Sequence, residues 1–437
     1  MKKINTSPIS GMQELLPRDQ AIFDNIKNQI TDVYHHHGFQ HIETPVIDRT
    51  EILLAKAGGD TEKQIYKVFK TAETADDADQ ALRFDHTVPL ARYVVEHENE
   101  LTFPFKVTQF GRNFRGERAQ KGRFREFYQL DIDVIGRGNL PLAYDAEVAA
   151  TAVEALKTFI TRDFVLRISN RKILAGLVEY LGLESQLTAI SGIIDHAEKV
   201  PAKKTHECFE EEGIDAEKIK ILEDFMKIAG PRAEVIEKLN ALKIDNETFA
   251  LGVNELDTVL GLLETQDFGP RAKVIGDMLI IRGLDYYTGT VFETFMPEYR
   301  EIGSICSGGR YENLAGHYTD QKLPGVGISI GLTRLFFILN EYKLLENTEN
   351  ANPIDVAIIP ISENEFKFAL ELSNTIREKG LSTDVVLTDK KLSDKMSYAS
   401  KTANYGVVIG ESEASGGEIS IKNFATGEKS SLDQFLK

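Results

Sequence analysis

The chain has 437 residues, a formal net charge of −17 at pH 7 and two cysteines. This length allows two or three domains with their own cores. The acidic charge argues against general nucleic-acid binding, although local basic patches could still bind RNA or a nucleotide. There is no CxxC motif and no Cys/His metal spacing, so we expect neither disulfides nor a structural zinc site. No apolar run approaches the ~18 residues of a membrane span, and the N-terminus has no apolar core of signal-peptide length. We therefore expect a cytoplasmic protein without a membrane segment.

A helix is the first predicted element, at residues 19–37. Isoleucine and valine side chains recur there at spacings of four, four and three residues, which is typical of one apolar helix face. Gly38 is expected to end this helix. The following residues, 39–48, favour a strand that is interrupted at Pro45.

A short polar group lies at residues 83–87, with the sequence RFDHT. On an extended segment Asp85 and Thr87 share a side, because they are two residues apart, and together they are suited to hold an ammonium group. A strand end followed by a turn explains the same residues equally well.

A strongly basic loop follows within Gly111–Arg125, where six basic residues and one glutamate give a local net charge of +5. The residues on either side, 102–110 and 125–135, predict two strands of one antiparallel sheet. A guanidinium offers two donors to two oxygens, so the loop predicts a polyanion held at one place. A solvated charged hairpin is the alternative.

The strand after this loop alternates strictly between polar and apolar residues. Gln129, Asp131 and Asp133 therefore share one face of the predicted sheet. Burying these groups without a partner would be costly, which favours a ligand over a solvated hairpin. A cationic group is the natural partner for the two carboxylates.

The composition and periodicity of the sequence change at about residue 184. From there to about residue 271, amphipathic segments rich in glutamate and lysine predict a helical insertion. Strand patterns resume at Val274–Ile281 and at Thr290–Phe295.

A motif of mixed charged and aromatic residues, RGLDYYTGTVFE, lies between these two strands and continues into the second, at 282–293. Arg282 directly follows an apolar run, so we expect a cation at the mouth of a buried strand. Tyr286 and Tyr287 are able to stack on a ring ligand or to hydrogen-bond with it, although tyrosine pairs more often fill a core or a surface.

Two glycine-rich motifs come next. The first contains Gly308 and Gly309, which permit close approach of a ligand or a tight turn, and the turn is the commoner reading. In the second, at 325–331, glycines alternate with apolar residues and predict a strand with a bare face, on which either a flat ring or a packed helix could lie. Arg334 falls in the first turn of the helix that follows. The spacing is not that of a dinucleotide-binding fingerprint.

A polar segment that ends in proline, residues 343–353, is interpreted as a linker. Beyond it, apolar runs at 355–359, 383–386 and 405–409 alternate with helical patterns. This alternation predicts a small, mostly parallel α/β domain.

Together these segments resemble the histidyl-tRNA synthetases, a family of class II aminoacyl-tRNA synthetases, over nearly the whole chain. The first helix and strand are similar to motif 1, FRGERAQKGRFREFYQLDIDVIG to motif 2 and PGVGISIGLTRL to motif 3. RGLDYYTGTVFE and SGGRYENL resemble the two histidine-specific signatures, which are the most specific matches.

The resemblance implies an α+β catalytic domain built on an antiparallel sheet at residues 1–342, containing the helical insertion at about 184–271. After the linker at 343–353, residues 354–437 would form an α/β anticodon-binding domain. Because motif 1 builds the dimer interface in this family, the resemblance also implies a homodimer.

The resemblance assigns roles by position. Arg115 would bind the α-phosphate of ATP, and Arg282 would be a second cation beside it, so these two are the expected catalytic residues. Arg123 and Arg334 would hold the outer phosphates, with Arg334 also reaching toward adenine. The histidine substrate would contact Asp85, Thr87, Gln129, Asp133, Tyr286, Tyr287 and Tyr311.

One segment departs from the bacterial pattern. Where many bacterial members have Pro-Glu-Gly-Thr, this chain has Phe-Asp-His-Thr at 84–87, and aspartate is one methylene shorter than glutamate. This form resembles the eukaryotic-like members, so Asp85 keeps its expected role.

The implied chemistry has two steps. The carboxylate of L-histidine attacks the α-phosphorus of ATP, giving histidyl-adenylate and pyrophosphate, and the terminal ribose of tRNA(His) then attacks the acyl carbon. Positioning and charge stabilisation supply the catalysis without a side-chain nucleophile. Magnesium would bridge the phosphates rather than sit in a protein cage, and no prosthetic group is implied.

Three other functions compete with this one. The regulatory subunit of ATP phosphoribosyltransferase resembles the catalytic domain and senses histidine, but it lacks the anticodon-binding domain and usually the full arginine set that this chain has. An RNA-binding scaffold would not need those arginines. A class II synthetase for another amino acid conflicts with the two histidine-type signatures.

Overall fold

The structure is a computed structural model that describes residues 4–55, 62–74, 78–281, 286–312, 314–345 and 352–437. The chain divides into two compact units, with the boundary between Leu344 and Leu345, and Glu14–Asn28 groups with the second unit. Across the described residues no helix is both long and apolar enough to cross a membrane.

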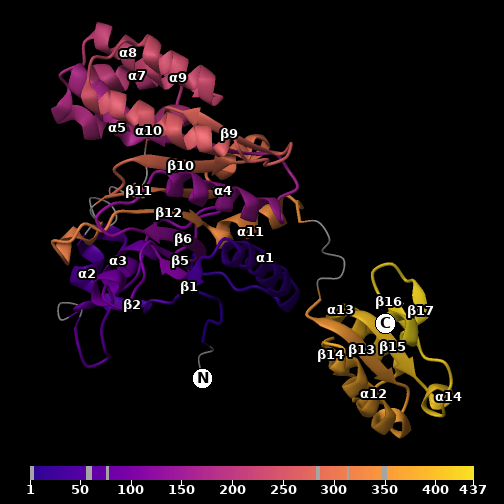
Figure 1. Ribbon diagram of the computed structural model, residues 1–437. Helices are drawn as coiled ribbons and strands as arrows, with labels where there is room; N and C mark the ends of the chain where they lie inside the picture. The colour runs from indigo at the N-terminus through magenta and orange to yellow at the C-terminus, as the bar shows by residue number, and fades with distance from the viewer. Residues whose placement is uncertain (1–3, 56–61, 75–77, 282–285, 313, 346–351) are drawn as a thin grey trace. The chain divides into compact units, whose positions relative to one another are not determined.

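A large sheet with an antiparallel centre organises the first unit (Figure 1). Its strands are β1 (Gln40–His41), β5 (Phe105–Phe114), β6 (Glu126–Ile135), β7 (Phe164–Asn170), β8 (Ala229–Gly230), β9 (Ala272–Asp277), β10 (Thr290–Phe295), β11 (Cys306–Tyr311) and β12 (Gly325–Ile330). Within the described residues they follow the order β1-β5-β6-β12-β11-β10-β7-β9-β8. All neighbours from β5 to β7 pair antiparallel, whereas β1 with β5 and β7 with β9 pair parallel. The predicted α+β fold on an antiparallel sheet is confirmed.

The helix predicted at the start of the chain is α1 (Pro17–His36), and Gly38 ends it with a φ of 80°. The strand predicted at residues 39–48 is instead divided at the proline. Its first part is β1, and its last part is β2 (Ile47–Arg49), which belongs to a small sheet with β4 (Gln80–Leu82) and β3 (Lys67–Val68). Proline lacks the N–H that a continuous strand would require.

The remaining helices of the first unit surround the large sheet and extend beyond it. They are α2 (Thr50–Leu54), α3 (Thr87–Glu96), α4 (Ala143–Lys157), α5 (Arg171–Tyr180), α6 (Leu187–His196), α7 (Ala202–Glu211), α8 (Ala216–Met226), α9 (Arg232–Ala241), α10 (Glu247–Leu263) and α11 (Leu332–Glu341). In Figure 1, α7, α8 and α9 lie together beyond α5 and α10. The segment predicted as a helical insertion is not wholly helical, because β8 lies inside it and pairs with β9.

Three local predictions were wrong. The strand expected at Val274–Ile281 ends at Asp277, whose Oδ1 accepts a hydrogen bond from the backbone of Leu279 at 3.0 Å and turns the chain. The paired glycines 308–309 do not form a turn but lie inside β11, between β10 and β12. The segment at 83–87 is not extended throughout: β4 ends at Leu82 and α3 begins at Thr87, which agrees with the alternative of a strand end followed by a turn.

The second unit is a smaller α/β structure. Its elements are β13 (Ile354–Pro360), α12 (Phe366–Glu378), β14 (Thr383–Val385), α13 (Leu392–Thr402), β15 (Ala403–Ile409), α14 (Glu411–Ala414), β16 (Ser420–Asn423), β17 (Lys429–Ser431) and α15 (Leu432–Phe435). In the described part of this unit, the strand order is β14-β13-β15-β16-β17. The first three strands are parallel as predicted, but β16 and β17 add two antiparallel pairings, so the sheet is mixed.

Candidate active site

Two cavities lie beside β6, β11 and β12 and have Ser329 as a common wall residue. The outer cavity has a volume of about 300 Å³, and the residues that line it include Arg115, Glu117, Arg123, Gln129, Ser307 and Arg334. The inner cavity has a volume of about 20 Å³ and is lined by Thr87, Asp131, Asp133, Tyr287, Tyr311, Gly327, Ile328 and Ser329. One cavity is thus rich in cations and the other in carboxylates and phenol rings.

The hairpin of β5 and β6 supplies two arginines of the outer cavity. Arg115 follows β5, and its Nε donates to the backbone oxygen of Phe84 at 3.1 Å while its guanidinium lies over the ring of Phe127 at 5.0 Å. Arg123 closes the loop, and its Nη1 lies 3.4 Å from Glu117 Oε2. Arg115 is therefore held in place before any ligand binds, whereas Arg123 is half-exposed.

The third arginine of the outer cavity is Arg334, in the first turn of α11 as predicted. Its Nη1 donates to the backbone oxygen of Ser304 at 3.2 Å. Burial lowers the pKa of Arg334, and the like charge of Arg123 lowers it further. An anion between the two guanidinium groups would offset both effects, so the outer cavity is suited to phosphate.

Two carboxylates lie almost fully buried at the inner end of the site. Asp133 on β6 and Asp85 before α3 are each 3% exposed. Burial, reinforced by the charge of Asp131, raises the pKa of Asp133 to about 8, and burial raises the pKa of Asp85 to about 6. A bound cation would lower both pKa values and favour the ionised groups, which fits the ammonium group predicted for this place.

Asp85 reaches the site through the start of a helix rather than through strand alternation. Its Oδ1 accepts from the backbone N–H of Val88 at 3.1 Å, in the first turn of α3. Its Oδ2 accepts from the hydroxyl of Tyr286 at 3.4 Å, and Thr87 also hydrogen-bonds to that tyrosine. Asp85 and Thr87 therefore meet at one tyrosine.

Three tyrosines pack edge to face around the inner cavity. The ring centroids of Tyr286 and Tyr287 are 4.9 Å apart at 71°, and those of Tyr286 and Tyr311 are 6.1 Å apart at 89°. The hydroxyl of Tyr311 donates to Asp133 Oδ1 at 3.0 Å. This arrangement offers flat apolar walls with polar edges, which suits a small aromatic ring that carries hydrogen-bonding atoms.

The glycine-rich strands make room for these side chains rather than directly for a ligand. A Cβ at Gly327 would lie 2.1 Å from Asp133 Oδ1, and one at Gly325 would lie 2.3 Å from the ring of Tyr311. A Cβ at Gly309 would lie 2.9 Å from the ring of Tyr287. The bare strand face predicted at 325–331 is present, and side chains of the site lie against it and against Gly309 of β11.

The inner cavity is too small for an imidazole as it stands. A volume of about 20 Å³ accommodates roughly one water molecule. The phenol rings of Tyr287 and Tyr311, which line this space, must therefore shift before a ring ligand can enter.

Comparison with known proteins identifies the family. The family model for histidyl-tRNA synthetase matches residues 11–335, and the model for an anticodon binding domain matches residues 355–436. The chain belongs to the histidyl-tRNA synthetase family. The resemblance drawn from its motifs is thereby confirmed.

Individual relatives agree with this family. The chain is 43% identical over 442 residues to a histidine–tRNA ligase of Clostridium tetani, covering 100% of this chain and 99% of the relative. The crystal structure of histidyl-tRNA synthetase from Nostoc sp. PCC 7120 matches 99% of this chain and 98% of that one, with a TM-score of 0.87 at 39% identity. An ATP phosphoribosyltransferase regulatory subunit/histidyl-tRNA synthetase of Bacillus halodurans C shares only the fold, with a TM-score of 0.74 at 23% identity over 93% of this chain and 98% of that one.

Most side chains expected from the histidyl-tRNA synthetase signatures come together in the structure. The outer cavity has all three arginines expected to hold ATP, and Gln129 lies in its wall next to Ser329. Thr87, Asp133, Tyr287 and Tyr311 line the inner cavity, with Asp85 and Tyr286 directly behind them. Arg282 lies outside the described residues, so its position remains a prediction.

Three residues of the site were not predicted from the histidyl-tRNA synthetase signatures: His86, Asp131 and Ser329. Asp131 is 4% exposed and lies on the same face of β6 as Gln129 and Asp133. The strict alternation along β6 was a signal for Asp131. His86 lies in the polar group at 83–87 and Ser329 in the glycine-rich segment at 325–331, but neither pattern indicated a contact with Asp131. His86 reaches it from just before α3, and Ser329 from β12.

Proposed function

We propose that this chain is a histidine–tRNA ligase, which activates L-histidine with ATP and transfers the histidyl group to the 3′ end of tRNA(His). The observation that supports this function best is the adjacency of the two cavities. An arginine-lined space for a polyphosphate adjoins a space of carboxylates and phenols for an amino acid, and Ser329 lies in the wall of both.

The proposed roles follow from this arrangement. Asp85 and Thr87 would lie at the ammonium end of histidine. Gln129 and Asp133 would also bind the amino acid, with the Asp133 carboxylate beside the ammonium group, and the three tyrosines would surround the side chain. The carboxylate of histidine would then lie toward the outer cavity, facing the α-phosphorus of ATP. A site that pairs the polar atoms of the imidazole discriminates against amino acids that lack them, because its own buried groups would remain unpaired.

The arginines would act on the phosphates. Arg115 would contact the α-phosphate, with Arg282 as a second cation beside it, and Arg123 and Arg334 would hold the outer phosphates. Preorganised cations of this kind stabilise charge as it develops in the transition state. The backbone anchor of Arg115 at Phe84 supports this role, because a fixed guanidinium needs no reorganisation during the reaction.

Magnesium would enter with ATP. Glu117 is the acidic residue among those that line the outer cavity, and the described residues contain no group of three or more His, Cys, Asp and Glu side chains that could hold a metal ion. This fits Mg²⁺ that is held mainly by phosphate oxygens, with at most one or two protein carboxylates. When bound, the ion would neutralise negative charge on the phosphates.

We also propose the domain roles and the assembly that the family implies. Residues 1–342 would be the catalytic domain with its insertion at about 184–271, and residues 354–437 would bind the anticodon of tRNA(His) after the linker at 343–353. The motif 1 region would form a homodimer interface. The protein would act in the cytoplasm.

Exchange of pyrophosphate into ATP tests the activity directly. With histidine and magnesium present, we expect radiolabelled pyrophosphate to appear in ATP, because formation of the adenylate is reversible. Omitting histidine, or replacing it with another amino acid, should abolish the exchange. A histidine sensor related to the regulatory subunit of ATP phosphoribosyltransferase would bind histidine and show no exchange, and this result would disprove the proposed function.

Replacing Asp133 with asparagine is expected to raise the KM for histidine by about tenfold or more, because a charge-assisted contact to the ammonium group is lost. The KM for ATP should change much less, since Asp133 lines only the inner cavity. Both constants can be measured in the exchange assay. An equal rise in the two would place Asp133 elsewhere in the mechanism.

The same substitution is expected to stabilise the free protein increasingly as the pH rises. The pKa of Asp133 is raised to about 8 in the folded state, whereas a carboxyl group in the unfolded chain titrates at about 3.9. Between these values the folded protein retains a proton that the unfolded chain has lost, so wild-type stability falls as the pH rises from about 4 to about 8 and then levels off. Urea unfolding of both proteins across this window should show a widening difference in stability, and a constant difference would contradict the raised pKa.

A further inference from the structure

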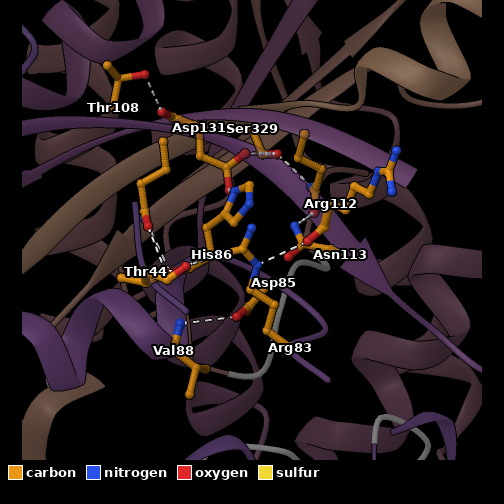
Figure 2. Close-up of polar contacts among 12 residues, drawn as sticks. Thr44, Arg83, Asp85, His86, Val88, Thr108, Arg112, Asn113, Asp131 and Ser329 are labelled. Atoms are coloured by element: carbon orange, nitrogen blue, oxygen red, sulfur yellow. Dashed lines mark hydrogen bonds and ion pairs between the residues drawn. The ribbon is translucent and has the colours of Figure 1, made fainter. Parts of the chain in front are cut away.

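A buried histidine lies directly behind the strand that carries the substrate-binding residues. His86 is 0% exposed, and its Nδ1 lies 2.9 Å from Asp131 Oδ2 (Figure 2). Its Nε2 has no hydrogen-bond partner among the described residues. A proton on Nε2 would therefore be unsatisfied, so the tautomer with its proton on Nδ1, donating to Asp131, fits the contacts best.

The other oxygen of Asp131 continues the contact toward the cavities. The hydroxyl of Ser329 donates to Asp131 Oδ1, and Figure 2 shows Ser329 beside the carboxylate on the side away from Thr108. Gln129 Nε2 donates to Ser329 Oγ at 2.6 Å. His86, Asp131, Ser329 and Gln129 therefore form one hydrogen-bonded chain from the core to the wall of the outer cavity.

The chemistry of a carboxylate fixes which groups donate and which accept along this series of hydrogen bonds. Carboxylate oxygens accept hydrogen bonds, so Ser329 donates to one oxygen of Asp131 and the Nδ1–H of His86 donates to the other. A Ser329 hydroxyl that donates to Asp131 must accept from Gln129, which turns the NH₂ group of Gln129 toward Ser329. The other end of the Gln129 amide lies 2.7 Å from the amide of Asn113.

His86 is itself held from several sides. Gln109 Nε2 donates to the backbone oxygen of His86 at 3.3 Å, and Thr44 Oγ1 donates to Gln109 Oε1 at 3.1 Å. A Cβ at Gly111 would lie only 3.2 Å from His86 Nε2, so the ring is packed against the backbone of β5. The imidazole therefore has little freedom to leave Asp131.

We propose that His86 is a positioning residue that acts through Asp131 and Ser329 to hold the amide of Gln129 in the orientation that binds the histidine substrate. This inference rests on the proposed function. Two aspartates on one face of β6 would then have different roles: Asp133 contacts the substrate, and Asp131 orients Gln129 through Ser329. Without His86, Asp131 would be a buried carboxylate with one oxygen unpaired. The donor and acceptor roles of Ser329 and Gln129 would then no longer be fixed.

The test compares three variants in the exchange assay. His86→Leu is expected to raise the KM for histidine by roughly ten- to hundredfold, the effect of one hydrogen bond to a charged group. The KM for ATP should change less, because the contacts that are lost do not involve Arg115, Arg123 or Arg334. His86→Asn should restore most of the loss, because the amide N–H of asparagine can take the place of Nδ1–H. Ser329→Ala, which removes a single hydroxyl between Asp131 and Gln129, should also raise the KM for histidine.

A second histidine–carboxylate pair provides the matched control. His37 Nε2 lies 2.8 Å from Glu154 Oε2, outside the residues that line the two cavities. The His37 and Glu154 side chains are 25% and 43% exposed, so His37→Leu controls for the loss of a histidine–carboxylate contact away from the cavities, and its two KM values should rise together or not at all.

The possible results are distinct. Any of three results would overturn the inference. The first is a KM for histidine within twofold of wild type in both His86→Leu and Ser329→Ala. The others are equal rises in the KM values for histidine and ATP, and no recovery of the histidine KM in His86→Asn. If His86→Leu does not fold, Ser329→Ala decides alone, because it leaves the core intact. Absence of exchange in the wild-type protein would instead reject the proposed function.

Discussion

Replacing Arg115 with alanine is expected to slow histidine-dependent ATP–pyrophosphate exchange by roughly 10²–10³-fold, which corresponds to ~2.7–4 kcal/mol of lost transition-state stabilisation. The reason is the fixed position of the guanidinium, whose Nε donates to the backbone of Phe84 while its plane lies over Phe127. The loss should appear mainly in kcat, since a preorganised cation acts on charge that develops during the reaction. Arg115→Lys should recover only part of the rate, because an ammonium group lacks the bidentate geometry of a guanidinium.

Arg112, on the same hairpin, is the control for a general loss of positive charge. Its side chain is 53% exposed and its Nη1 lies 3.0 Å from Glu126 Oε1. Arg112 does not line the outer cavity, but its Nε donates to the hydroxyl of Tyr128, which does, at 2.6 Å. Arg112→Ala should slow the exchange much less than Arg115→Ala, because an exposed ion pair contributes only about 0–1 kcal/mol and the guanidinium does not face the cavity itself. Equal losses in Arg112→Ala and Arg115→Ala would show that the hairpin acts through its overall charge and would remove Arg115 from its specific role.

Replacing Asp145 with alanine is expected to lower the free energy of unfolding of the first unit by ~3–5 kcal/mol, because it leaves a buried cation without its partner. Asp145 on α4 is 0% exposed, and Arg310 on β11 is 4% exposed. Arg310 Nη2 donates to Asp145 Oδ1 at 2.7 Å, and Thr290 Oγ1 donates to Oδ2 at 2.6 Å. The measurement is the urea transition of the first unit, followed by circular dichroism.

Glu312 is the matched control for this ion pair. Its Oε1 also contacts Arg310, at 3.3 Å, but its side chain is 35% exposed. Glu312→Ala should cost less than about 1 kcal/mol. Because Arg310 directly precedes Tyr311 in β11, Asp145→Ala should also raise the KM for histidine, and a variant of normal stability and normal KM would contradict the anchoring role of the pair.

The hairpin of β5 and β6 shows how much could be predicted from the sequence. A strand of period two and a dense group of arginines are local patterns, and each predicts its own geometry without knowledge of the rest of the chain. The faces of β6 and the position of Arg334 in the first turn of α11 were therefore predicted correctly, whereas the fold class followed from the family resemblance. The family motifs added the roles, which residue types alone left open.

The failures share a cause. The paired glycines at 308–309 predicted a turn, because nothing nearby shows that β10 and β12 lie on either side of them. The mixed sheet of the second unit was missed for a similar reason, since β16 and β17 are short and acquire their pairing only beside β15. Strand pairing depends on partners that are distant in sequence, and a local pattern does not identify them.

By itself, the sequence determined which residues could carry the chemistry: the arginines for phosphate, the carboxylates for an ammonium group and the tyrosines for a ring, each recognisable from its type and spacing. The tertiary structure alone decided which of them meet, and which other residues hold them. His86 lies just before α3, Asp131 on β6 and Ser329 on β12, and their hydrogen-bonded network exists only once the sheet has formed. The physical reason is that hydrogen bonds act over about 3 Å, whereas these residues are separated by up to about 240 positions along the chain.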